Sequence, residues 1–142
     1  MLRRGVAAAL VLVVLAGAAS AGDTTPLAVV MHPTRHATLT RDDVALIYLR
    51  RKRFWDDGTP IVPLNLAGGS PMRAAFTDAV LRQSERVLAD YWNRQYFYGI
   101  LPPATLASTE AVLRYVASDP NAIGYVPASA VDDSVAVLIR IE

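Results

Sequence analysis

The segment from Gly68 to Arg73 holds the residues best suited to bind a ligand. It reads Gly-Gly-Ser-Pro-Met-Arg and directly precedes apolar residues at helical spacing. The first N–H groups of a helix have no partner within the helix and lie at the positive end of its dipole, so they attract anions. Gly69 allows close backbone approach, Ser70 offers a hydroxyl and Arg73 a planar guanidinium. We predict an oxyanion site formed by Gly69, Ser70, Met72 and Arg73.

Two other interpretations of this segment are weaker or simpler. Ser at the N-cap followed by Pro is an ordinary helix start, and Pro71 removes one N–H donor, so a plain cap remains an open alternative. A Ser nucleophile in a Gly-x-Ser-x-Gly turn is not expected, because Met72 stands where the last glycine belongs. Nothing in the sequence ties His32 or His36 to Ser70 as a base. We therefore expect no catalytic residue and no enzymatic activity.

Other polar groups give weaker signals. His32 and His36 flank Pro33 in a predicted loop, and no cysteine or acidic cluster completes a metal site, so we expect neither a metal nor a cofactor. The basic run Arg50–Arg53 is most simply a solvated helix end, where cations favour the dipole. If one of its members helps to bind the ligand, Arg53 is the candidate, because it lies nearest Trp55. Tyr125 is a second additional candidate, in a predicted strand that could line a cleft.

The first 21 residues have the pattern of a secretory signal peptide. Arg3 and Arg4 precede an apolar run from Gly5 to Ala18, and Ala19-Ser20-Ala21 forms a cleavage site. The run is short for a spanning helix, which needs about 20 residues, so a retained anchor is the less favoured alternative. We predict cleavage after Ala21, a mature domain over residues 22–142, and a periplasmic or secreted location without a stable membrane span.

Composition excludes several classes of partner and chemistry. Two of the 14 basic residues belong to the predicted signal, so the remainder, with 13 acidic residues, has a net charge of −1. A nearly neutral protein lacks the electrostatic footprint expected for nucleic-acid binding. The chain has no cysteine, which excludes disulfides and thiolate chemistry. Stability must come from burial of apolar residues, for which the predicted mature length is sufficient.

Strand and helix patterns alternate along the predicted mature chain, which favours a single α/β layer structure. We predict strands over 27–31, 61–64, 122–126 and 135–139, with Pro63 indicating an edge or an end of its strand. Helices are predicted after Thr40, Ser70, Ser84 and Ser108, each of which is a suitable N-cap. In the third helix Val87, Leu88, Tyr91 and Trp92 form one stripe, which we interpret as core rather than as an aromatic ligand platform.

Seven segments, taken in order, resemble a known family. They are Leu39-Thr40-x-Asp42-x-Val44-x-x-Ile47-Tyr48, Arg53-Phe54-Trp55-x-Asp57-Gly58-Thr59-Pro60-Ile61-x-Pro63, Gly69-Ser70-Pro71-x-Arg73-x-x-Phe76, Tyr91-Trp92, Phe97-x-Gly99, Pro102-Pro103 and Ala122-Ile123-Gly124-Tyr125-Val126. This pattern resembles small single-domain proteins related to the phosphate-binding components of ABC transporters, of the type II periplasmic-binding fold. The resemblance covers most of residues 27–140, and it rests on the order and spacing of the segments rather than on one motif.

The resemblance implies one lobe of such a receptor, a central mixed sheet flanked by helices, with a Ser-containing loop at a helix start that holds an oxyanion. It also implies a departure, because complete receptors have two lobes and bind the anion between them. The loop after the first strand here, from His32 to Thr38, lacks the glycines of the family pattern. We expect a non-catalytic periplasmic module for phosphate or a similar oxyanion. The alternative is an accessory interaction domain that contacts an envelope protein or a second copy of itself.

Overall fold

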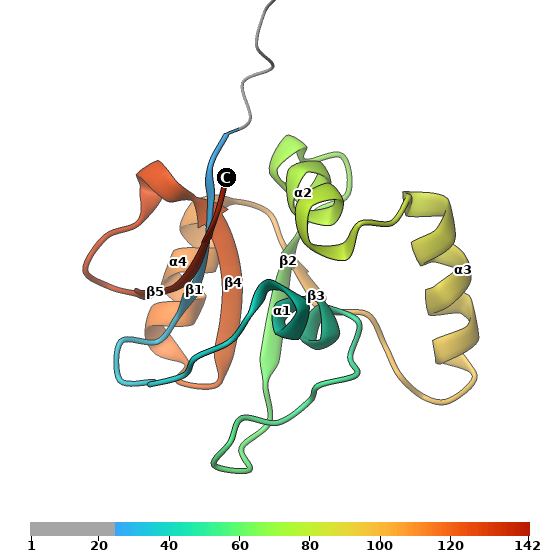
Figure 1. Ribbon diagram of the computed structural model, residues 1–142, viewed down its shortest axis with the longest axis horizontal. Coiled ribbons are helices and arrows are strands. Elements are labelled where there is room, and N and C mark those ends of the chain that lie inside the picture. The colour runs from blue at the N-terminus through green and yellow to red at the C-terminus, as the bar shows by residue number, and fades with distance from the viewer. Residues whose placement is uncertain (1–24) are drawn as a thin grey trace, which may run out of the picture.

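The computed structural model describes residues 25–142, which form a five-stranded mixed sheet with helices on both faces (Figure 1). The strand order is β3-β2-β4-β1-β5; β1 is antiparallel to both of its neighbours, whereas β2 is parallel to β3 and to β4. The predicted α/β fold with a central mixed sheet is confirmed.

The elements are β1 (Leu27–Met31), α1 (Arg41–Tyr48), β2 (Val62–Leu66), α2 (Pro71–Phe76), a π-helical turn (Thr77–Leu81), α3 (Glu85–Tyr96), β3 (Ala104–Leu106), α4 (Thr109–Ser118), β4 (Ala122–Pro127), a 3₁₀ turn (Ala128–Ala130) and β5 (Ala136–Ile141).

All four predicted helix starts are confirmed. The side chains of Thr40, Ser70, Ser84 and Ser108 each accept a hydrogen bond from the backbone N–H three residues later. Thr40 also forms a capping box, because the Asp43 carboxylate accepts the Thr40 N–H in return at 2.8 Å. Capping satisfies N–H groups that the helix itself leaves free, and it fixes where each helix leaves its loop.

The two faces of the sheet are covered differently. α4 packs on one face, where Val112 and Val116 approach Gly124 of β4 so closely that a Cβ on this glycine would lie 2.6 Å from Val112. α1 and α2 cover the other face (Figure 1), where Phe76 stacks on Tyr125 with ring centroids 3.9 Å apart. Because α4 needs this close approach, a small residue is required at position 124.

Pro63 marks an end of its strand, which is one of the two predicted alternatives, and one strand was not predicted. β2 is an interior strand rather than an edge strand, and it tolerates Pro63 because β3 pairs with it only from Leu64 onward. Pro63 thus lies near the start of β2, where the flank towards β3 has no ladder that would need its N–H. The short edge strand β3 was missed, since its three residues follow Pro102-Pro103 and show no strand period.

The helix α3 departs most from its prediction. It stands to one side of the sheet (Figure 1), and only Tyr91 of the predicted core stripe is buried. Val87 is 49% exposed, and Leu88 and Trp92 are partly exposed. Tyr91 anchors the helix: its hydroxyl donates to the Leu49 carbonyl at 2.6 Å, and Arg51 lies over its ring. Helical periodicity identified the apolar stripe but not the distance of the helix from the sheet.

The predicted signal segment, residues 1–21, lies outside the described residues. Within residues 25–142, no helix is long and apolar enough to cross a membrane.

Candidate oxyanion site at the carboxyl edge of the sheet

The candidate site lies where the parallel strands end. β2, β3 and β4 point the same way, so their carboxyl ends meet at one edge of the sheet, and both α2 and α4 begin there. The Ala67 N–H, directly after β2, donates to the carbonyl of Leu106, the last residue of β3, at 3.1 Å. This bond holds the two strand-to-helix loops side by side. In open α/β sheets, this edge is where ligands bind.

The loop before α2 brings Gly69, Ser70 and Met72 together. Gly69 has φ +85°, a left-handed conformation that glycine adopts without strain. The Ser70 hydroxyl oxygen accepts the Arg73 N–H at 3.4 Å, which leaves the hydroxyl proton free to donate. Within residues 25–142, the N–H groups of Gly69 and Met72 make no hydrogen bond. The loop therefore combines one hydroxyl donor with two available backbone donors.

Arg73 does not extend towards the loop but turns back to the sheet. Its Nη1 donates to the Leu66 carbonyl at 3.0 Å, at the last residue of β2. The side chain is partly buried, and this is the one hydrogen bond that the guanidinium makes within the described part of the chain. A guanidinium has five N–H donors, so most of its binding capacity remains available.

Tyr125 does not line a cleft. The prediction that it could be an additional ligand-binding residue needs correction, because its side chain is not accessible. The side chain is fully buried, because it packs face to face on Phe76 in the core. Its hydroxyl donates to Asn65 Oδ1 and accepts the Leu66 N–H at 3.3 Å. Burial raises the pKa of Tyr125 to about 12, although Leu66 and Arg73 act against this shift. Tyr125 thus fixes the end of β2 from below.

Arg53 lies elsewhere. It lines a different hollow, of about 450 Å³, together with Arg50, the start of β2 and the segment from Gly99 to Ala104. Its side chain is exposed, and the hollow that it lines is not the one that Arg73 lines. Arg53 was chosen because it lies near Trp55 in the sequence. Trp55, however, lies at the opposite edge of the sheet from the Ser70 loop.

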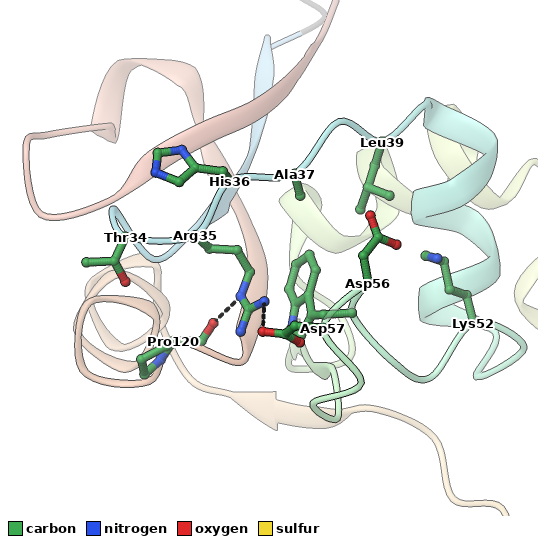
Figure 2. Close-up of a pocket in the computed structure, with 10 residues that line it drawn as sticks. Thr34, Arg35, His36, Ala37, Leu39, Lys52, Asp56, Asp57 and Pro120 are labelled. Carbon is green, nitrogen blue, oxygen red and sulfur yellow. Dashed lines mark hydrogen bonds and ion pairs between the residues drawn. The ribbon is translucent and has the colours of Figure 1, made fainter.

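At that opposite edge, one arginine, Arg35, is the centre of a hydrogen-bonded cluster that the sequence did not reveal (Figure 2). Arg35 donates to the Pro120 carbonyl at 2.6 Å, to Asp57 at 3.2 Å, to Thr59 at 3.3 Å and to Asn121 at 3.0 Å. It also stacks 4.5 Å from the centroid of the Trp55 ring. A hollow of about 420 Å³ lies beside this cluster. Because four of its five N–H donors are already used, Arg35 joins three loops rather than offering an anion site.

The described residues contain no group of three or more acidic or histidine side chains placed to hold a metal ion. Of the two histidines, His32 bonds through Nδ1 to the hydroxyl of Thr34, two residues away, at 2.8 Å.

Comparison with solved structures decides the fold. An ABC-type phosphate transport receptor from Vibrio cholerae superposes with a TM-score of 0.65 at 19% identity, over 81% of this chain and 46% of the receptor. The fold is therefore that of a small PstS-like domain. PstS from Borrelia burgdorferi matches with a TM-score of 0.62 at 14% identity, over 81% of this chain and 50% of PstS. No protein-family model and no curated protein matches the sequence.

A third solved structure is the most informative about ligands. A protein from Clostridium perfringens described as a phosphate ABC transporter substrate-binding protein, with phosphate bound, has a TM-score of 0.63 and 25% identity. The match covers 81% of this PstS-like chain and 45% of that protein. The chain thus spans about half the length of the receptors it resembles, and the resemblance to phosphate-binding components of ABC transporters is confirmed at the level of the fold.

Proposed function

We propose that this protein is a non-catalytic binding module for phosphate or a similar oxyanion, held by the loop from Gly69 to Arg73. The observation that carries the proposal is the coincidence of two facts. The fold is that of phosphate-transport receptors, one of them solved with phosphate bound, and the Ser70 loop lies at the carboxyl edge of the parallel strands. This edge is where α/β sheets of this kind bind their ligands.

The chemistry of the loop supports an anion as the ligand. The N–H groups of Gly69 and Met72 and the hydroxyl of Ser70 are donors, and no carboxylate lies in this short segment. Arg73 would add a charge-assisted hydrogen bond from the side of the sheet, and bonds of this kind are about twice as strong as neutral ones. A tetrahedral oxyanion has enough acceptor oxygens for the three donors of the loop and for Arg73, whose side chain would turn from the Leu66 carbonyl towards the loop.

Export is part of the proposal. We infer that Met1–Ala21 is removed as a signal peptide and that residues 22–142 act in the periplasm. The N-terminal sequence pattern supports this inference, as does the association of the solved receptors with ABC transport.

A second candidate function rests on a separate observation. The chain spans about half the length of the receptors that it resembles, and it exposes three consecutive aromatic residues at the end of α3: Tyr96 at 68%, Phe97 at 87% and Tyr98 at 78%. Exposed apolar groups of this size indicate a contact surface. An accessory domain would use this surface to bind an envelope protein or a second copy, without binding an anion.

Isothermal titration calorimetry of the purified protein with sodium phosphate, sodium sulfate and sodium chloride tests the proposal. We expect saturable heat with phosphate or sulfate but not with chloride. Ser70→Asp should abolish the heat, because aspartate still caps the helix but repels an anion. Ser84→Asp is the matched control, since Ser84 caps α3 in the same way and should leave binding unchanged. No oxyanion heat at millimolar concentration, or equal heat in Ser70→Asp, would remove the oxyanion function.

A further inference from the structure

A hollow of about 260 Å³ separates α3 from the sheet, and nothing proposed above uses it as a whole. Asn65 and Thr105, which face each other on β2 and β3, form its floor. Leu88 and Trp92 of α3 form the opposite wall. These are two members of the stripe that periodicity assigned to the core. They are only partly buried because the hollow, and not the sheet, lies in front of them.

Thr77 places a hydroxyl group in the lining of the hollow. The residue is only 6% exposed, and it lines the hollow. A hydroxyl in a helical segment bonds back to a carbonyl or to a group outside the helix. Thr77 therefore offers a donor to whatever occupies the hollow.

Two further donors converge on the same space. The Asn65 side-chain oxygen is already occupied, because it accepts from the Tyr125 hydroxyl and from the Leu66 N–H at 2.9 Å. Its NH₂ group is thereby left to the hollow, which Asn65 lines. Arg73 lines it too, and its guanidinium is held in place by the Leu66 carbonyl. An amide, a hydroxyl and a guanidinium together match a carboxylate.

The remaining lining residues restrict the ligand further. Glu85 lies at the exposed rim, so the two charged residues of the hollow, Arg73 and Glu85, sum to zero. A zwitterion would present one opposite charge to each of these two residues. Leu88, Trp92 and Pro103 add an apolar wall.

We propose that the hollow between α3 and the β2–β3 edge binds a small α-amino acid with an apolar side chain. Arg73, Asn65 and Thr77 bind its carboxylate, Glu85 binds its ammonium group, and Leu88 and Trp92 contact its side chain. The inference goes beyond the proposed oxyanion function, because it needs neither the Ser70 hydroxyl nor the backbone of Gly69 and Met72.

Calorimetry of the purified protein with L-leucine, L-valine and L-phenylalanine is the first test. At least one of the three should give saturable heat. For that ligand, the amide that lacks the carboxylate and the acid that lacks the ammonium group should each bind at least tenfold more weakly. Absence of heat with all three amino acids would overturn the proposal, as would equal affinity for the acid without an ammonium group.

Variants locate the binding. Thr77→Val, which keeps the shape of the side chain, should weaken amino-acid binding about tenfold, since it removes one buried hydrogen bond. Thr105→Val tests the exposed floor in case the Thr77 variant folds poorly.

Glu85→Gln should weaken binding of the amino acid but not of the acid without an ammonium group. Glu110→Gln is its matched control, because Glu110 occupies the first turn of α4. Unchanged affinity in Glu85→Gln, or in every Thr77 and Thr105 variant that folds, would overturn the site.

The two proposals share Arg73, but they can fail independently because each also needs residues that the other does not use. Ser70→Asp should abolish phosphate heat and leave amino-acid binding intact, whereas Thr77→Val should do the reverse. Loss of both ligands in Ser70→Asp would contradict a separate site in the hollow.

Discussion

The two edges of the sheet each hold one arginine whose side chain turns inward, and the two arginines differ in how many of their donors are used. Arg35, at the amino ends of β2 and β4, makes four hydrogen bonds and stacks on Trp55. Arg73, at the carboxyl ends, makes one hydrogen bond within the described residues, to the Leu66 carbonyl. A guanidinium whose donors are used holds loops together, whereas one with free donors can bind a ligand. The number of donors in use, and not the residue type, separates the structural edge from the edge at which we propose binding.

The largest expected effect comes from the saturated arginine. Arg35→Ala should lower the free energy of unfolding by about 3 kcal/mol, because the Pro120 carbonyl and the Asn121 side chain lose charged hydrogen bonds in a partly buried place. The exposed ion pair with Asp57 should add little to this loss. Urea unfolding measures the change.

Arg35→Lys sharpens the same point. Lysine keeps the charge but has no planar fork to reach three loops, so most of the lost stability should remain lost. Full recovery with lysine would show that charge rather than geometry matters at this edge.

The next effect concerns the polar network beneath Arg73. The pKa of Tyr125 is raised by burial to about 12 from an ordinary value of 10.0. Above pH 10 the unfolded chain releases the phenolic proton while the folded chain still holds it, so the contribution of this group to stability is lost between about pH 10 and 12. The loss should amount to about 3 kcal/mol. The difference in unfolding free energy between the native protein and Tyr125→Phe should therefore shrink over this range, and a constant difference would contradict the assignment.

The smallest effect on stability is expected at the unsaturated arginine. Arg73→Ala should lower the free energy of unfolding by no more than about 1 kcal/mol, because a single hydrogen bond to a carbonyl is lost. Its effect on ligand binding should be far larger, with phosphate affinity reduced at least tenfold in calorimetry. If Arg73→Ala destabilised the protein as much as Arg35→Ala, the contrast between the two edges would fail.

Local signals in the sequence predicted much of the fold. Thr40, Ser70, Ser84 and Ser108 located the four helix starts, because a cap depends only on residues three positions apart. The run Leu27–Met31 predicted its strand to the residue. The order of the quoted segments predicted the receptor-like fold, which the solved structures bear out.

Contacts between residues far apart in the chain could not be predicted from the sequence. Arg35 bonds to residues more than 80 positions away, and no spacing pattern marks such a partner. The sequence pattern instead singled out the basic run Arg50–Arg53, of which Arg50 and Arg53 line a different hollow, away from the Ser70 loop. Asn65 was missed because its role depends on Tyr125, 60 residues later. The position of α3 could not be predicted either, since periodicity gives the apolar face of a helix but not what that face meets.

Backbone amide NMR during a phosphate titration tests the central claim most directly. The account predicts saturable shifts of the Gly69 and Met72 amide signals with a single dissociation constant, and no comparable shifts in the loops joined by Arg35. Unchanged signals at Gly69 and Met72, or shifts confined to the Arg35 loops, would contradict an oxyanion site at the start of α2.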